Sequence, residues 1–105
     1  MDIETLRGAI QSGRIRISDH ADEEAAADRF TLDDVLHSVG QGELIEDYPA
    51  DSPYPSCLVY GTTSNDLPVH SVWAYNETNS WCVLITVYRP DPNLWIDWRQ
   101  RRSES

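Results

Sequence analysis

Trp81-Cys82-Val83-Leu84-Ile85-Thr86-Val87-Tyr88 is apolar at nearly every position and rich in β-branched and aromatic residues. This composition favours a β-strand, and continuous apolarity is typical of a strand that is buried on both faces. We therefore expect a strand that lies inside a sheet or under a helix. Pro90 and Pro92 should end it, because proline lacks the backbone N–H that a sheet requires.

Three further strand patterns precede this run and are separated by turn signals. Residues 49–55 contain three prolines and are expected to form a loop. Shorter turns are expected at residues 64–66 and 76–79. The expected strands are 44–48, 57–60, 69–75 and 81–88. Strands joined by such short turns form an antiparallel meander.

The N-terminal part of the chain carries helix signals instead. Asp2 is expected to cap a helix over about residues 3–12, with Gly13 as the glycine that ends it. Residues 14–17 then alternate polar and apolar side chains, which predicts a short strand.

Two more helices are expected before the strands begin. Asp19 is a suitable cap for a polar helix over about residues 20–28, which lacks a large apolar face. Thr31 opens a capping-box pattern before a helix over about residues 32–39. The glycines that follow should end this helix.

The order of these elements defines the fold class. Two or three N-terminal helices packed on one face of a four- to five-stranded antiparallel sheet form an α+β domain. Residues 94–98 fit either a short strand or a pair of helical turns, and a polar tail is expected from about residue 99. The chain of 105 residues has the size of one domain, covering 1–105.

The formal net charge is −10, and all basic residues are arginines. Residues 1–52 hold 13 acidic residues against four arginines, so the acidity lies in the helical half. Such a surface repels nucleic acids and anionic membranes at long range and favours a basic partner. Solubility is the alternative explanation of the charge.

The chain shows no apolar run long enough for a membrane-spanning helix, and its first residues lack the basic and apolar stretches of a signal peptide. We therefore expect a cytoplasmic protein without membrane contact. Cys57 and Cys82 lie in apolar strand patterns. Buried free thiols are expected in a reducing compartment, with a disulfide between them as the alternative.

His70 is the strongest candidate for chemistry because it lies within the strand expected at residues 69–75. A three-residue turn at 64–66 would place Tyr60 directly opposite it. Histidine can carry a proton near neutral pH. The alternative is a histidine that only forms hydrogen bonds inside the sheet.

The neighbour of His70 on the other side depends on one residue of register, because side chains alternate between the faces of a strand. A two-residue turn would place His70 on the face of Val87 and Arg89. A three-residue turn would place it on the face of Thr86 and Tyr88. Both sets offer a proton donor or an anion-binding group.

Two pairs of histidine and carboxylate occur at helical spacing, His20 with Glu24 and Asp33 with His37. Such a pair can contribute two ligands to a metal, but no third ligand is in register. We therefore expect no metal or other cofactor, and a surface pair in each case.

Trp95 and Trp98 stand beside Arg99, Arg101 and Arg102 near the C-terminus. Tryptophan and arginine together are typical of protein interfaces and of surfaces that stack nucleic-acid bases. A solvated chain end is the alternative for this segment.

Five segments form a recognisable combination. They are Ile17-Ser18-Asp19-His20-Ala21, Gly42-Glu43-Leu44-Ile45-Glu46-Asp47-Tyr48-Pro49, Pro53-Tyr54-Pro55-Ser56-Cys57-Leu58-Val59 with Gly61, Pro68-Val69-His70-Ser71-Val72-Trp73-Ala74-Tyr75 and Ile85-Thr86-Val87-Tyr88-Arg89-Pro90-Asp91. Together they resemble a family of small bacterial domains catalogued without a known function, which is similar in pattern to the RelE and BrnT toxins. The resemblance runs from about Arg14 to Trp98.

The resemblance implies a compact sheet with helices packed on it. RelE-like toxins cut messenger RNA without a metal, some of them only on the ribosome, and a partner antitoxin neutralises them. By this resemblance the candidate catalytic residues are His70, Tyr88 and Arg89. The candidate binding residues are His20, Glu24 and Tyr60.

Two hypotheses follow. In the first, the protein is a toxin-like endoribonuclease in which His70 carries a proton while Tyr88 and Arg89 orient or bind the phosphate. In the second, it is a non-catalytic interaction domain, a degenerate toxin fold that binds a basic or antitoxin-like partner through its acidic half. The second draws on the net charge, which disfavours RNA, and on Glu24, which stands where the family usually has arginine.

Overall fold

Two of the three helices begin at the residues that the sequence predicts as caps. The carboxylate of Asp2 accepts a hydrogen bond from the first turn of α1 (Ile3–Gln11). Thr31 and Asp34 form a reciprocal capping box at the start of α3 (Leu32–Gly40). Each cap satisfies backbone N–H groups that have no partner within the helix.

The remaining helix, α2 (Asp19–Ala27), begins one residue earlier than predicted. Ser18 rather than Asp19 is its cap, and the Oγ atom of Ser18 accepts a hydrogen bond from the backbone of Ala21 at 3.1 Å. The same hydroxyl donates to the carbonyl of Ile85 at 3.1 Å. Serine fits here because a hydroxyl both donates and accepts, whereas a carboxylate only accepts.

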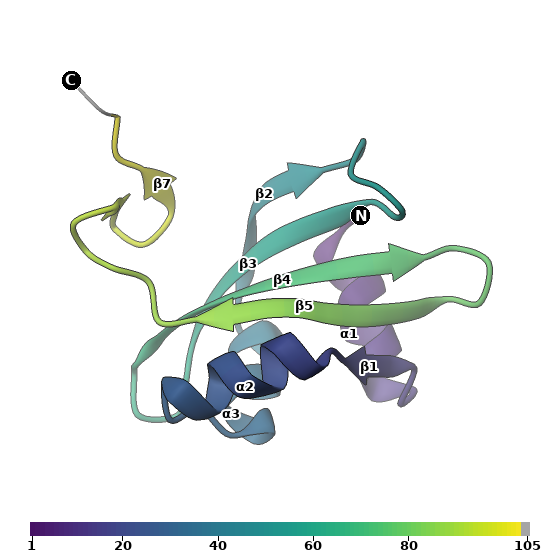
Figure 1. The fold of residues 1–105 in the computed structure, drawn as a ribbon, viewed down its shortest axis with the longest axis horizontal. Helices are drawn as coiled ribbons and strands as arrows, with labels where there is room; N and C mark the ends of the chain where they lie inside the picture. Colours follow the sequence, from purple (N-terminus) through teal and green to yellow (C-terminus); the bar gives the residue numbers. More distant parts are fainter. Residues whose placement is uncertain (104–105) are drawn as a thin grey trace.

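The strands form a five-stranded sheet in the order β1-β5-β4-β3-β2 (Figure 1). The strands are β1 (Ile15–Ile17), β2 (Glu43–Tyr48), β3 (Ser56–Thr62), β4 (Pro68–Asn76) and β5 (Trp81–Tyr88). From β2 to β5 they form the predicted antiparallel meander. The prediction of a purely antiparallel sheet is wrong, because β1 pairs with β5 in parallel. This pairing joins segments that the sequence separates by two helices and three strands, so no turn signal reveals it.

The structure is a computed structural model that describes residues 1–103. Of the two alternatives for residues 94–98, the short strand is correct. β6 (Trp95–Ile96) forms a small hairpin with β7 (Gln100–Arg101), which lies at the start of the predicted tail, and the last two positions of that tail lie outside the described residues. We call residues 95–101 the C-terminal hairpin. Its turn places Asp97 and Trp98 at positive φ angles of 53° and 61°.

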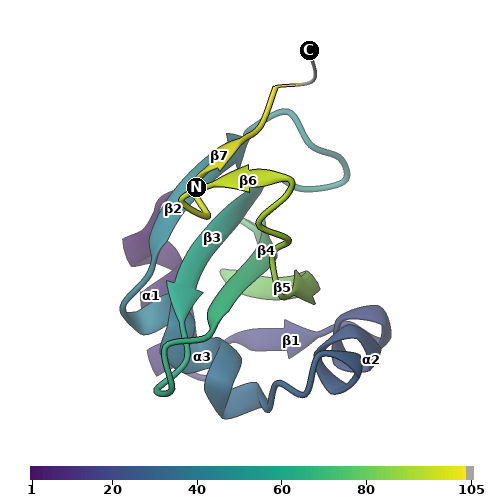
Figure 2. The same cartoon turned by 90° about the vertical axis from the view of Figure 1, so that its left-hand side faces the viewer.

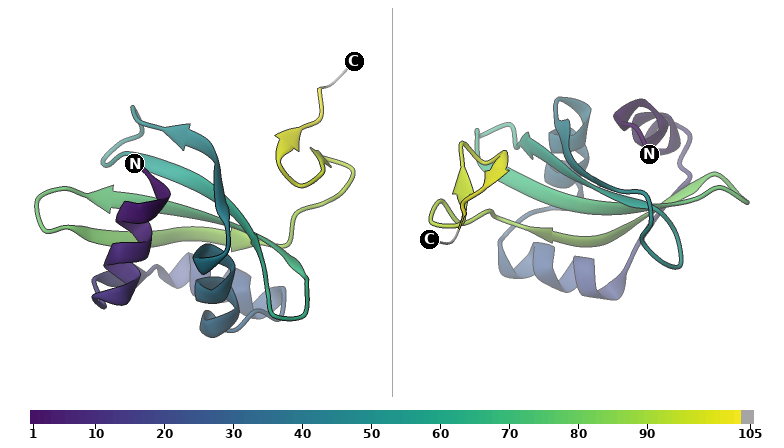
Figure 3. Two further views of the ribbon diagram at one scale, coloured as in Figure 1. Left: turned by 180° about the vertical axis from the view of Figure 1, so that it is seen from behind. Right: turned by 90° about the horizontal axis from the view of Figure 1, so that it is seen from above.

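The helices and the C-terminal hairpin lie on different sides of the sheet. α1 and α3 pack on one face, seen in front of the strands when the molecule is viewed from behind (Figure 3). α2 runs alongside β5 (Figure 1). The C-terminal hairpin lies on the opposite face, next to β2, β3 and β4 (Figure 2). The sheet therefore has one face covered by helices and one face covered in part by the hairpin.

The core lies between the helices and the sheet and is centred on Trp73, which is fully buried. It includes Leu6 of α1, Val39 of α3 and Leu84 of β5. The prediction that β5 is buried on both faces is wrong, because Ile85 is 37% exposed on the sheet face that no helix covers. No helix among residues 1–103 has the length and apolar character needed to cross a membrane.

Candidate active site

His70 is fully buried beneath the C-terminal hairpin, and both of its ring nitrogens have partners. Nε2 lies 2.7 Å from the carbonyl oxygen of Trp98, and Nδ1 lies 3.2 Å from the hydroxyl of Tyr88. A carbonyl only accepts, so Nε2 carries the proton and donates it to Trp98. Nδ1 is then free to accept a hydrogen bond from Tyr88, and the imidazole is neutral.

The protonation states of this pair follow from its burial. Burial lowers the pKa of His70 below its ordinary 6.5, while the Trp98 carbonyl and Glu46 act in the opposite direction. Burial also raises the pKa of Tyr88 above its ordinary 10.0. At neutral pH the pair therefore holds a neutral imidazole that can accept a proton and a phenol that keeps its own.

Three aromatic rings enclose His70. The ring centroids of Trp95, Tyr88 and Tyr60 lie 4.5, 5.3 and 5.9 Å from the His70 ring, each in an edge-on arrangement. Tyr60 is the direct cross-strand partner of His70, which confirms the register predicted between these strands. His70 is thus fixed in orientation by aromatic packing as well as by its two hydrogen bonds.

A β-bulge brings Tyr88 to His70. The register between β4 and β5 shifts by one residue after Trp73 pairs with Leu84, so that Val72 pairs with Thr86 and His70 with Tyr88. Without this extra residue, Val87 would be opposite His70. Of the two predicted neighbour sets, the structure selects Tyr88, and it does so through the bulge rather than through the length of the turn.

α2 holds the bulged part of β5. Beyond the end of β1, the edge of β5 that faces away from β4 has no neighbouring strand, and side chains of α2 take its place. The carboxylate of Glu24 accepts hydrogen bonds from the hydroxyl of Thr86 and, at 3.3 Å, from the backbone N–H of Val87. Ser18 donates to the carbonyl of Ile85 at the bulge itself. The acidic helical half was expected to bind a partner. One of its carboxylates, that of Glu24, instead supports the sheet.

The predicted site residues fall into two groups. His70, Tyr88 and Tyr60 come together beneath the C-terminal hairpin. His20 and Glu24 form a separate pair on α2, with His20 Nε2 3.2 Å from Glu24 Oε1. The two groups meet only through β5, which Glu24 supports.

Arg89 does not join either group through its side chain. Its backbone N–H donates to the Asp28 carboxylate at 2.8 Å, and its guanidinium is exposed. Within residues 1–103, no hydrogen bond or ion pair connects that guanidinium to His70 or Tyr88. The structure therefore separates Arg89 from the residues with which it was grouped.

Arg101 of the C-terminal hairpin and the adjacent Arg102 lie near Tyr88, where Arg89 was expected. A pocket of about 450 Å³ opens beside the buried histidine, and its lining comes from β5, the hairpin and the residues next to it: Tyr88, Leu94, Trp95, Arg101 and Arg102. The adjacency of tryptophan and arginine in the sequence indicated a binding surface here, but nothing in it indicated that this segment folds back onto His70.

The described residues hold no cluster suited to a metal ion. Among residues 1–103, no three His, Cys, Asp or Glu side chains come together as ligands. His37 contacts Gln41 rather than Asp33. Cys57 and Cys82 are buried free thiols, as predicted. The site beneath the hairpin therefore offers acid–base groups and cations.

The fold and site define a class of protein: an α+β domain with a mixed five-stranded sheet, a helical face, and a histidine–tyrosine pair on the other face. The family model described as "Domain of unknown function (DUF4258)" matches residues 17–89, and the chain belongs to that family. The match includes His70 and Tyr88 and ends before the C-terminal hairpin. Searches of curated proteins and of solved structures found no match.

Proposed function

We propose that the protein is a metal-independent endoribonuclease of the RelE and BrnT toxin-like type. The observation that carries this proposal is the hydrogen-bonded pair of His70 and Tyr88 at the edge of a pocket that also contains Arg101 and Arg102. The pair supplies proton transfer and the arginines supply positive charge, which are the two requirements of RNA cleavage without a metal.

The pair can activate the 2′-hydroxyl of an RNA nucleotide. Tyr88 lines the pocket, so its oxygen takes the 2′ proton while its own proton passes to Nδ1 of His70. The 2′ oxygen then attacks the adjacent phosphorus, and the bond from phosphorus to the 5′ oxygen breaks. The 5′ oxygen takes a proton from solvent. His70 then releases its extra proton to solvent through Tyr88, so that the pair returns to its starting state. The products are a 2′,3′-cyclic phosphate and a 5′-hydroxyl.

His70 suits the role of proton acceptor for two reasons. Its lowered pKa keeps it neutral at physiological pH, so it can take the proton from Tyr88. The Trp98 carbonyl 2.7 Å from Nε2 then stabilises the imidazolium that forms. His70 is a proton carrier behind Tyr88, and Tyr88 is the residue that meets the substrate.

The test is cleavage of free RNA and of messenger RNA on translating ribosomes, with a chelator present. We expect His70→Gln and Tyr88→Phe to lose most activity, because each breaks the proton path. Arg89→Gln is the matched control and should stay active, because its side chain has no described contact with the pair. The wild-type product should carry a 2′,3′-cyclic phosphate.

Absence of cleavage on both substrates from well-folded protein would refute the proposal. Activity retained in Tyr88→Phe would refute the proton path while leaving the activity itself in place. Circular dichroism of each variant separates loss of activity from loss of fold.

A second function, binding of a basic or antitoxin-like partner, draws on the outward face of α2. Asp19, Asp22 and Glu23 are exposed there, and none forms an ion pair among the described residues. A face of unpaired carboxylates attracts a basic surface.

The test of this second function is binding of a polylysine peptide to wild type and to Asp22→Arg/Glu23→Arg. A loss of affinity that is larger at low salt supports the interaction surface, and equal binding refutes it. Glu24 and Asp28 are unsuitable for charge reversal, because they support β5.

A further inference from the structure

We propose that Arg99 and Arg101 form a binding site for the phosphates of single-stranded RNA, which Glu43 and Glu46 of the same chain occupy when RNA is absent. This inference rests on the proposed function and names how the site binds its substrate. The hairpin that carries both arginines lies after the region that the family model matches.

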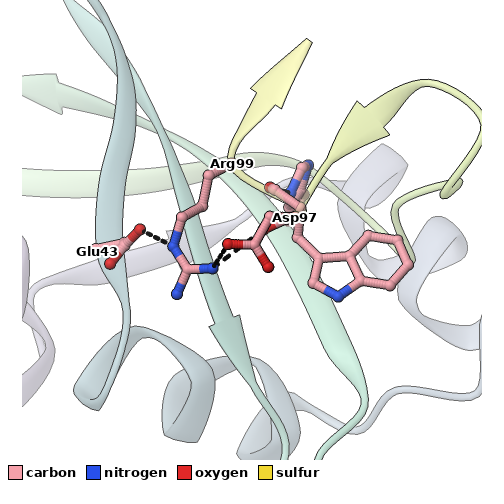
Figure 4. Close-up of polar contacts among 5 residues, drawn as sticks. Glu43, Asp97 and Arg99 are labelled. Atoms are coloured by element: carbon pink, nitrogen blue, oxygen red, sulfur yellow. Dashed lines mark hydrogen bonds and ion pairs between the residues drawn. The ribbon is translucent and has the colours of Figure 1, made fainter. Parts of the chain in front are cut away.

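Each arginine is held by a carboxylate of β2. Nε of Arg99 lies 2.5 Å from Oε1 of Glu43, and its Nη1 lies 2.9 Å from Oδ2 of Asp97 (Figure 4). Arg101 binds both oxygens of Glu46, at 2.9 Å through Nε and 3.2 Å through Nη2. This two-point contact is the geometry with which arginine also binds phosphate. The glutamates therefore occupy the positions that phosphate oxygens would take.

Aromatic rings fix both guanidinium groups next to the buried histidine. The guanidinium of Arg99 lies 4.8 Å from the centroid of Tyr60, and that of Arg101 lies 4.7 Å from the centroid of Trp95. Both rings also pack against His70. Arg101 therefore lies in the pocket that Tyr88 lines, whereas Arg99 lines a separate pocket with Tyr60 and Glu43, and both are held in place before any ligand arrives.

The Arg99–Glu43 pair is open to solvent on both sides, whereas Glu46 of the Arg101 pair is 22% exposed and also accepts a hydrogen bond from Tyr48. The side chains of Arg99 and Arg101 are 44% and 64% exposed. An exposed ion pair such as Arg99–Glu43 is weak and is screened by salt, whereas the two-point Arg101–Glu46 pair is the stronger of the two. An RNA strand that contacts Arg99, Arg101 and the nearby Arg102 at once binds at several points. It competes with two separate carboxylates, each of which binds one arginine.

Displacement would also loosen the cover over His70. Within residues 1–103, the hydrogen bonds between the C-terminal hairpin and the five-stranded sheet are those that Arg99 and Arg101 donate to β2 and the one that the Trp98 carbonyl accepts from His70. Trp98 has a φ of 61°, a conformation that a bulky residue adopts only under constraint. Exchange of the glutamates for phosphates therefore removes the arginine–glutamate contacts of the hairpin, while the buried Trp95 ring and the Trp98 carbonyl still contact the histidine.

This arrangement reconciles an acidic chain with an RNA substrate. The net charge of −10 opposes RNA at long range, and two of the acidic residues neutralise the cations nearest the candidate site. Affinity for RNA should then be low in the wild type and limited by Glu43 and Glu46.

The experiment measures fluorescence anisotropy of a labelled single-stranded 2′-O-methyl RNA, which binds but cannot be cleaved. Glu43→Gln/Glu46→Gln should raise affinity about tenfold, because two cations lose their internal partners. Asp22→Asn/Glu23→Gln removes the same charge from α2 and is the matched control. Arg99→Gln/Arg101→Gln should lose binding.

An increase in RNA affinity that is larger in Glu43→Gln/Glu46→Gln than in the Asp22→Asn/Glu23→Gln control supports the masked site. No gain, or an equal gain in the control, overturns it. The assay is independent of catalysis. Tight binding without cleavage of ordinary RNA would reject the endoribonuclease and keep the phosphate site. If the protein cleaves RNA but Glu43→Gln/Glu46→Gln binds RNA no more tightly than the wild type, the masked site is rejected and the endoribonuclease is kept.

Discussion

The carboxylate of Glu24 in α2 accepts a hydrogen bond from the backbone N–H of Val87 in β5 at 3.3 Å, across 63 positions of the sequence. β1 ends before it reaches this part of β5, so the N–H has no strand to bond with. A helix side chain thus completes the edge of the sheet. Asp28 does the same for the N–H of Arg89 at 2.8 Å.

Replacing either carboxylate should therefore destabilise the fold. We expect Glu24→Ala to lower the free energy of unfolding by about 1–3 kcal/mol, because the partly buried N–H of Val87 loses its acceptor. Asp28→Ala should cost about 0.5–1.5 kcal/mol, because its hydrogen bond to the Arg89 N–H is exposed to solvent. Glu24→Gln should cost less, since an amide oxygen still accepts. Asp22→Ala and Glu23→Ala are controls on the same helix and should stay within about 0.5 kcal/mol. Urea denaturation measures all five variants, and equal losses across the helix would contradict the edge role.

The contact of α3 with β3 leads to a second prediction. A Cβ atom at Gly61 would lie 1.8 Å from the backbone oxygen of Ser38, a distance that no side-chain rotation relieves. Gly61→Ala should cost about 3 kcal/mol or more, because α3 must move off the sheet. Gly8→Ala in α1 is the matched control, since a Cβ there meets nothing within 4 Å. It should stabilise the protein by about 0.5–1 kcal/mol, and a small loss at Gly61 would contradict the close packing.

Local signals in the sequence predicted much of this fold. The caps at Asp2 and Thr31 were predictable because a capping side chain bonds to a backbone N–H within the next turn. The pairing of Tyr60 with His70 was predictable because a short connection fixes the register of two neighbouring strands.

The candidate site depended on contacts that no local pattern shows. The bulge that moves Tyr88 opposite His70 is held by Ser18 and Glu24, which lie far away in the sequence. The C-terminal hairpin was not predictable for another reason. Its turn places Trp98 at positive φ, where glycine and asparagine are the usual residues. The sequence therefore supplied most of the site residues but not the arrangement that brings them together.

The two cysteines should be unreactive while the protein is folded. Burial raises the pKa of Cys57 to about 12 and that of Cys82 to about 11, so almost no thiolate exists near neutral pH. We expect iodoacetamide to label neither residue in native protein and both in urea, as measured by mass spectrometry. Labelling of native protein at the rate seen in urea would show that the region around β3 and β5 opens readily.

The neutral state of His70 gives the protein a pH-dependent stability. The groups that face the imidazole are Tyr60, Tyr88, Trp95, Glu46 and Arg101. Burial outweighs the favourable effect of Glu46 and lowers the folded-state pKa below 6.5, the ordinary value that applies to the unfolded chain. Above pH 6.5 both states hold a neutral imidazole, and the full contribution to stability is present. Below it, the unfolded chain takes up a proton that the folded protein refuses.

The free energy of unfolding should therefore fall as the pH drops from 6.5 toward the folded-state pKa of His70, and this contribution should fall no further below that pKa. His70→Gln tests the origin of the slope, because a glutamine can donate to Trp98 and accept from Tyr88 without titrating. We expect this variant to lose part of the slope that lies just below pH 6.5 in urea denaturation. An NMR titration of the His70 ring in wild type gives the pKa directly. An unchanged slope in His70→Gln, or a ring that titrates above 6.5, would contradict the burial of a neutral histidine.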